Sequence, residues 1–201
     1  MPVFPRDLAS PQLDFFLMRD SVVTLFWRED LFDEALSELR NLGYKVITLE
    51  SEVFPDVEAL LVAIGRALNF PDYFGRNLDA LNDCLRDVAT FDYGSDPDST
   101  GTVMSFRHYD RIVKLGRDGA EAILDIFTDR ARDGLLFGHR MMVLVQTDDP
   151  NLSLGPLGAQ HAQWNEQEWM DITRHPDREP RNAMEAGALR RVSHLDKESD
   201  A

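Results

Sequence analysis

Short runs of β-branched and aromatic residues alternate along this chain with segments whose apolar residues recur at helical spacing. The runs, each a predicted strand, lie at 22–27, 44–49, 102–106 and 141–145. Helices are predicted between them, at about 32–41, 55–69, 77–88, 109–113 and 118–133. Such alternation is typical of a parallel sheet covered by helices, because parallel strands need long crossovers. We therefore predict the α/β class, with a small parallel sheet of three core strands and an extra N-terminal strand that extends the sheet edge.

Three regions of the chain differ in character. Residues 1–42 consist of an arm over the first twenty positions and an accessory strand–helix unit, whereas residues 43–149 carry the regular alternation. In the C-terminal extension, 150–201, the pattern weakens, but the segment around Trp164 and Trp169 is apolar enough to dock. After about residue 175, six acids and five bases accompany hardly any large apolar side chain, so we expect disorder there.

Acidic residues dominate the charge of the chain. Its 201 residues include 36 Asp and Glu against 21 Lys and Arg, a formal net charge of −15. This excess argues against nucleic acid or a membrane as the partner and favours attraction to a basic protein. The one cysteine, Cys84, excludes an internal disulfide framework and a multi-cysteine zinc site. We recognise neither a targeting segment nor a membrane span, and we expect a soluble cytoplasmic protein.

Negative charge is concentrated on the outer faces of two predicted helices. Opposite the leucines of the helix at 77–88 lie three aspartates, Asp79, Asp83 and Asp87. The helix at 118–133 repeats the row with Glu121, Asp125, Asp129 and Asp133. A charged outer face can simply be solvated, but like charges four positions apart cost roughly 0.2–0.5 kcal/mol per pair. Two rows with little internal neutralisation therefore suggest an external cationic partner.

The run FPDYFGRNLDALNDCL, residues 70–85, resembles the signature of the barstar family, the intracellular inhibitors of barnase-type ribonucleases. The resemblance extends over roughly 43–149, where the flanking strands and helices come in the family's order. It implies a three-stranded parallel sheet packed by helices, and an inhibitor rather than an enzyme, with no cofactor or metal. The inhibitory surface that it implies is the loop and helix at 73–87, helped by an acid on the last helix.

The resemblance also indicates which residues bind the partner. In the family, carboxylates on this surface occupy the place of substrate phosphate and pair with Arg, Lys and His of the nuclease. The partner-binding residues predicted in this chain are Tyr73, Gly75, Asn77, Asp79, Asn82, Asp83, Asp87 and Asp129. Tyr73 matches the family's loop tyrosine, Asp79 and Asp83 match its two inhibitory aspartates, and Asp129 stands in place of a glutamate. From the residues alone, Asn77 is also a good N-cap for the helix that follows it.

This chain departs from the family's pattern at three positions. Asn82 replaces a tryptophan, Val88 replaces another aromatic residue, and Arg76 stands where the family has an acid. Aromatic residues are frequent anchors of interfaces, so the hydrophobic half of the surface is thinned while its acidic half is retained. We therefore predict an inhibitor of a basic ribonuclease or nuclease toxin that can differ from barnase.

Two other hypotheses remain open. Asp79, Asp83 and Asp129 could hold Mg²⁺ or Ca²⁺ for hydrolysis, although neither a nucleophile nor a general base accompanies them. The five histidines are scattered and do not show the spacing of metal ligands. Alternatively, the same fold serves as a non-inhibitory interaction module that uses Trp164, Trp169 and the N-terminal strand to join a partner or a second copy.

Overall fold

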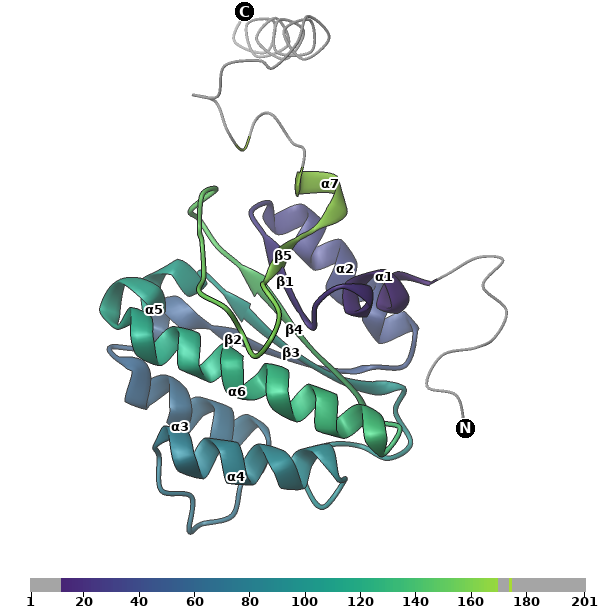
Figure 1. Ribbon diagram of the computed structural model, residues 1–201, viewed down its shortest axis with the longest axis vertical. Coiled ribbons are helices and arrows are strands. Elements are labelled where there is room, and N and C mark those ends of the chain that lie inside the picture. Colours follow the sequence, from purple (N-terminus) through teal and green to yellow (C-terminus); the bar gives the residue numbers. More distant parts are fainter. Residues whose placement is uncertain (1–11, 170–173, 175–201) are drawn as a thin grey trace, which may run out of the picture. The chain divides into compact units, whose positions relative to one another are not determined.

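A computed structural model describes residues 12–169 and residue 174. The helices and strands follow one another in the predicted alternation (Figure 1). The elements that carry the sheet and its cover are α1 (Leu13–Arg19), β1 (Val23–Phe26), α2 (Glu29–Asn41), β2 (Lys45–Glu50), the 3₁₀ turn η1 (Ser51–Val53), α3 (Val57–Ala67), α4 (Leu78–Ala89), β3 (Gly101–Arg107), α5 (Tyr109–Leu115), α6 (Arg117–Leu136), β4 (Arg140–Gln146) and β5 (Gln163–Trp164). A short helix, α7 (Glu166–Trp169), follows them.

All five strands run parallel in one sheet, in the order β2-β3-β4-β1-β5. The predicted α/β class, with a parallel sheet packed by helices, is confirmed. The N-terminal strand joins the three core strands beside β4, with Val23 opposite Val143. It thus extends the edge of the three core strands, as predicted, and β5 adds one more strand beyond it, where Trp164 pairs with Leu25. The sequence did not predict β5, because two residues are too few to show the alternation of apolar and polar residues that indicates a strand.

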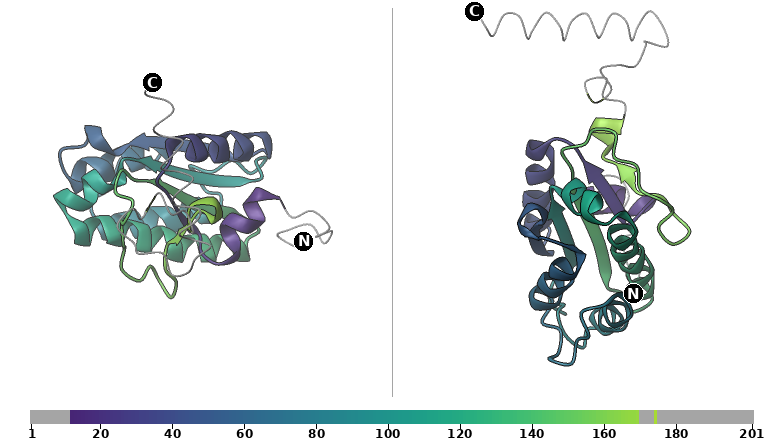
Figure 2. Two further views of the ribbon diagram at one scale, coloured as in Figure 1. Left: turned by 90° about the horizontal axis from the view of Figure 1, so that it is seen from above. Right: turned by 90° about the vertical axis from the view of Figure 1, so that its left-hand side faces the viewer.

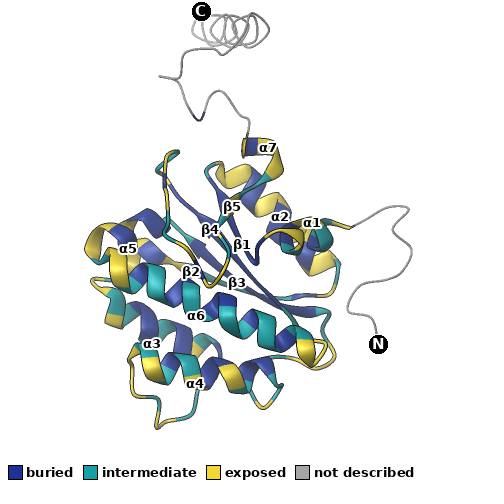
Figure 3. Ribbon diagram, in the orientation of Figure 1, coloured by how far each residue is buried: buried dark blue, intermediate teal, exposed yellow. Residues whose placement is uncertain are grey.

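Helices cover both faces of the sheet. Alternate strand residues such as Met104 and Phe106 face a core shared with α3, α4, α5 and α6, which we call the α6 face. Val103 and Leu144 point the other way, to a core shared with α1 and α2, the α2 face. Figure 2 shows the sheet between these two helical layers, and Figure 3 shows buried strands beneath helices whose outer sides are exposed. The site of interest lies on the α6 face.

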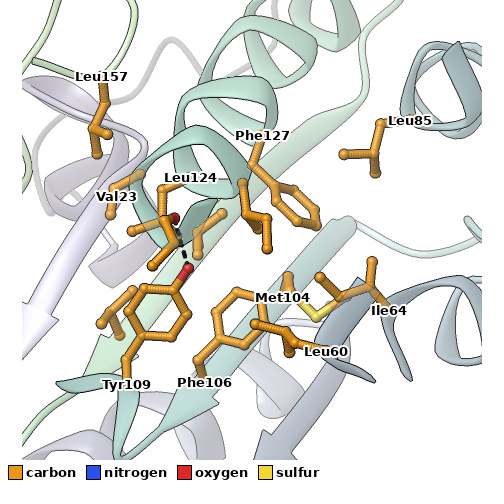
Figure 4. Close-up of a cluster of buried hydrophobic side chains, with 14 of the residues drawn as sticks. Val23, Leu60, Ile64, Leu85, Met104, Phe106, Tyr109, Leu124, Phe127 and Leu157 are labelled. Carbon is orange, nitrogen blue, oxygen red and sulfur yellow. Dashed lines mark hydrogen bonds between the residues drawn. The ribbon is translucent and has the colours of Figure 1, made fainter. Parts of the chain in front are cut away.

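The core of the α6 face joins the helices to the central strands. Figure 4 shows Phe106 and Met104 of β3 beneath Phe127 of α6, with Leu85 of α4 close by. Tyr109 is fully buried, and its hydroxyl donates a hydrogen bond to the carbonyl of Ala120 at 2.8 Å. These contacts fix α4 against α6 and thereby decide which side of α4 remains outside.

The N-terminal segment contains a helix that the sequence did not predict. The arm expected over the first twenty residues is wrong for Leu13–Arg19, which forms α1; residues 1–11 lie outside the described part. Asp14 is buried, accepts a hydrogen bond from the Tyr44 hydroxyl at 2.7 Å and pairs with Arg140 at 2.8 Å. Its partners are far away in the sequence, so the local pattern could not indicate that this charge is buried.

The chain divides into two compact units, residues 1–165 and residues 166–201. The predicted boundaries at 42/43 and 149/150 stay predictions, although β1 and β5, from outside 43–149, belong to the same sheet. Trp164 packs against the core of the first unit. In the second unit Trp169 is exposed, and Arg174 donates from Nε to the carbonyl of Glu168 at 3.0 Å. The disorder expected after residue 175 concerns residues outside the described part.

Among the helices of the described part, none is long and apolar enough to cross a membrane.

Replacing Leu85 with alanine tests whether the packing of α4 controls stability. Leu85 is completely buried, so we expect Leu85→Ala to lower the free energy of unfolding by about 2–5 kcal/mol through lost burial and a residual cavity. Urea denaturation followed by circular dichroism measures the change. Arg86→Ala on the same helix is the control and should stay within about 0.5 kcal/mol of the unmodified chain. Equal effects of the two substitutions would contradict the packing described.

Candidate partner-binding surface

The loop between α3 and α4 is anchored by aromatic side chains. The rings of Phe70 and Phe74 lie 5.0 Å apart at their centroids, and Tyr93 lies 6.0 Å from Phe70 on the other side. Gly65 of α3 makes room for them, because a Cβ there would come within 3.0 Å of the Phe74 ring. Tyr73, between the two anchors, is 79% exposed. The aromatic contacts thus fix the loop against α3, while the side chain of Tyr73 remains exposed to a partner.

Asn77 caps the helix that follows. Its Oδ1 accepts a hydrogen bond from the backbone N–H of Ala80 at 2.8 Å, so the predicted N-cap is confirmed. Its Nδ2 donates to the carbonyl of Gly75 at 3.3 Å. A Cβ on Gly75 would lie 3.2 Å from this Nδ2, so a larger residue there would crowd the cap. Gly75 and Asn77 therefore have a structural role at the start of α4, independent of any contact with a partner.

Helix α4 buries one side and exposes two predicted aspartates on the other. Leu81, Leu85 and Val88 are completely buried, as their helical spacing predicts. Asp79 is exposed and, among the described residues, has no ion-pair partner. Asp83 is paired with Arg86 at 3.5 Å, but 71% of its side chain remains exposed. Because such surface pairs contribute only about 0–1 kcal/mol, this pairing leaves Asp83 available to a stronger cationic partner.

The last turns of α4 are tied to the following loop. The Tyr93 hydroxyl lies 3.0 Å from Oδ2 of Asp87, to which it donates, and 3.2 Å from the carbonyl of Cys84. Burial, followed by the neighbouring side chains of Cys84 and Asp87, raises the pKa of Tyr93, so the phenol stays protonated as a donor. Cys84 is buried and contributes to the packed side of α4. Asp87 and Asn82 are each half-buried. Because the Tyr93 hydroxyl already donates to Asp87, this carboxylate has a partner within the chain.

The acidic row on α6 is neutralised from within the chain. Its ion pairs are Arg117 with Glu121 at 2.7 Å, Arg132 with Asp129 at 3.6 Å, and Arg130 with Asp133 at 2.8 Å. Asp125 accepts a hydrogen bond from the backbone N–H of Gly158. The expectation of two rows with little internal neutralisation is therefore wrong for α6, because arginines three and four positions away, and a loop remote in sequence, reach its acids. Among the predicted contact residues, Asp129 thus carries a surface ion pair of the same kind as that of Asp83.

A second charged group lies at the carboxyl ends of β1, β3 and β4. Glu29, His108 and Asp148 each offer one possible ligand atom, and these atoms lie within 4.8 Å of one another. Nδ1 of His108 is 2.9 Å from Oδ1 of Asp148. The other carboxylate oxygen of Asp148, Oδ2, pairs with Arg111 at 3.2 Å. Among the described residues this is the one convergent group of three, and Asp79, Asp83 and Asp129 do not form another. Sequence reasoning missed it because the three residues lie on different elements.

The charged state of His108 depends on this environment. Burial disfavours the charged imidazole, but the hydrogen bond and the charge of Asp148 outweigh it and raise the pKa of His108. Burial likewise opposes ionisation of Asp148, yet its bonds with His108, Gln146 and Arg111 lower the pKa of this carboxyl. The pair therefore joins the ends of β3 and β4 most strongly while the imidazole is protonated.

Comparison with known proteins identifies the family of this chain. The sequence model of one family, described as Barstar (barnase inhibitor), matches residues 44–146, about half of the chain. The chain belongs to the barstar family. It is also 49% identical, over 39 residues, to a Bacillus subtilis (strain 168) protein named "Putative ribonuclease inhibitor YrdF". That match covers 19% of this chain and 43% of the relative's length. Within the family match lie the loop and both helices of the candidate surface.

Removing the cap of α4 should destabilise the protein without disturbing its core. We expect Asn77→Ala to lower the free energy of unfolding by about 1 kcal/mol, because the N–H of Ala80 loses its acceptor. Chemical denaturation measures this difference. Asn82→Ala makes the same chemical change within the helix and should cost less, because alanine has the higher helix propensity. A larger loss from Asn82→Ala would refute the capping role.

The His108–Asp148 pair should make stability depend on pH. The folded-state pKa of His108 lies above its unfolded value, so the pair stabilises fully below about pH 6.5 and loses this contribution as pH rises through the folded pKa. We compare the unmodified chain with His108→Asn, which tolerates the left-handed backbone at this position, φ 51°. The difference in unfolding free energy should be larger at about pH 5.5 than at about pH 9. The same difference at both values would argue against the pair.

Proposed function

We propose that this barstar-family protein inhibits a basic ribonuclease or nuclease toxin by presenting Tyr73, Asp79 and Asp83 to its active site. The observation that supports this most strongly is the exposure of Asp79 and Asp83 on a helix whose other side is completely buried. The family of the chain and the name of its relative support the same reading.

A carboxylate on a fixed helix is a suitable substitute for a substrate phosphate. It is an anion with two acceptor oxygens, and it pairs with guanidinium groups through charge-assisted hydrogen bonds that can be bidentate. It carries no bond for the nuclease to hydrolyse. Since the buried residues Leu81, Leu85 and Val88 already hold α4 in place, little conformational freedom is lost when the carboxylates enter the active site.

The charge of the whole chain would support the encounter. A net charge of −15 attracts a cationic enzyme over distances up to about a Debye length, and because this length grows as salt is lowered, the association rate rises at low salt. Once the partners are in contact, the exposed ring of Tyr73 offers the apolar area that the carboxylates lack. Long-range attraction and local packing thus come from different residues of the same surface.

The other predicted contact residues have secondary parts in this proposal. Gly75 and Asn77 shape the start of α4, and Asn82 and Asp87 border Asp83 on the helix. Asp129, on α6, is paired with Arg132 at 3.6 Å, much as Asp83 is paired with Arg86, and its side chain is the less exposed of the two. We infer an inhibitor that is not itself an enzyme and that acts in the cytoplasm as an antitoxin or immunity protein.

The proposal is tested by isosteric removal of one charge. The unmodified chain and Asp83→Asn are immobilised, exposed to lysate of the host organism, and the eluates are assayed for RNA-cleaving activity that excess inhibitor suppresses. We expect Asp83→Asn to weaken binding of the recovered nuclease at least about tenfold, because an amide cannot replace the ionic partner. Association should also slow as ionic strength rises toward ~0.15 M, where screening reaches ~8 Å.

A matched variant separates this contact from the general charge. Glu34→Gln removes one negative charge from α2, which lies on the α2 face and thus across the sheet from α4. It should change binding by less than about twofold. Equal losses from both variants, or eluates that contain only metabolic enzymes, would reject the inhibitory surface.

A further inference from the structure

Two exposed arginines beside the Tyr73 loop have no ionic partner. Within the described ranges, Arg40, Arg66 and Arg76 are the arginines that form neither an ion pair nor a side-chain hydrogen bond. Arg40 and Arg66 stand in the last turn of α2 and α3, where the helix dipole favours a cation. Arg76 has no such support and stands in an otherwise acidic loop and helix. In a chain with this excess of acids, the unpaired Arg76 therefore calls for an explanation.

Arg66 and Arg76 line the same hollow. It lies between α3 and the loop before α4, holds about 170 Å³, and has Val62, Phe70 and Phe74 among its apolar lining residues. Asp72 also lines it, but it lies beyond ion-pair distance of both guanidinium groups. Phe70 and Phe74 are the same rings that anchor the Tyr73 loop. The hollow is therefore continuous with the proposed inhibitory surface and opposite to it in charge.

We propose that this hollow receives a carboxylate side chain of the target protein. The inference rests on the proposed function and extends it to the choice of partner. Two guanidinium groups can hold one carboxylate through several N–H donors, and the Phe70 and Phe74 rings offer apolar contact to the methylene groups behind it. Phosphate could satisfy the same donors, but a protein partner that fills an aromatic-lined hollow is better matched by an Asp or Glu side chain with its methylene groups.

This arrangement gives the surface two signs of charge. Asp79 and Asp83 suit the basic groove with which a nuclease binds RNA, whereas Arg66 and Arg76 suit an acid at the rim of that groove. A nuclease whose surface is basic throughout would meet the two arginines with like charge and be rejected. The arginines thus act as a specificity element, which selects among nucleases that the aspartates alone would accept.

A direct test uses a tetraglutamate peptide as the carboxylate probe and inorganic phosphate as the competing anion. Binding to the full chain is followed by NMR at an ionic strength of about 0.15 M, where screening reaches about 8 Å, through the signals of Phe70 and Phe74. Arg76→Asn keeps a residue that tolerates the left-handed backbone there, φ 53°, and should raise the dissociation constant of the peptide at least about fivefold. Arg40→Asn, the control on the other face of the sheet, should change it by less than about twofold.

The outcomes separate this inference from the proposed function. Asp83→Asn should leave peptide binding unchanged while it weakens nuclease binding, so either idea can fail alone. Absence of peptide binding, equal effects of Arg76→Asn and Arg40→Asn, or phosphate binding as tight as that of the peptide would each overturn the carboxylate site. In the capture experiment, Arg76→Glu should recover at least about fivefold less nuclease than Arg40→Glu, and equal recovery would also overturn it.

Discussion

Helix α4 buries Leu81, Leu85 and Val88 against α6 and the sheet, and the other features of the candidate surface depend on this contact. With 3.6 residues per turn, a helix that buries these positions must turn Asp79 and Asp83 outward. The cap at Asn77 fixes where the helix begins, so the register of acids along its outer face is fixed as well. A surface that mimics an anionic substrate needs this rigidity, since every group left loose before binding has to be ordered during it.

The loop before α4 is held in a different way. Phe70 and Phe74 insert against α3, where Gly65 leaves room, and Tyr93 ties the loop to the last turns of α4. Apolar contacts thus fix the backbone while the groups that would meet a partner stay outside. The same arrangement leaves a hollow lined by two arginines next to the exposed tyrosine. One packing unit therefore positions an acidic, an aromatic and a basic element on a single surface.

Much of this could be predicted because it is encoded locally. The strand and helix pattern, the buried stripe of α4 and the cap at Asn77 each follow from a few neighbouring residues. Features that depend on distant partners were missed. Asp14 in α1 is buried by Tyr44 and Arg140, and β5 exists because β1 offers it an edge. The ion pairs of α6 are a different case: their arginines stand three or four positions from the acids in the same helix, so the sequence spacing could have indicated them.

The sequence by itself determined the parallel α/β architecture, the family and the outward direction of the α4 aspartates, since periodicity and capping act within one element. Only the tertiary structure decided which charges remain unpaired. It linked Asp125 of α6 to the backbone N–H of Gly158, left Asp79 without an ionic partner in the described part, and placed Arg66 and Arg76 at one hollow. The physical reason is that the free charge of a side chain depends on what lies within a few ångströms of it, and chain folding, rather than sequence spacing, sets those distances.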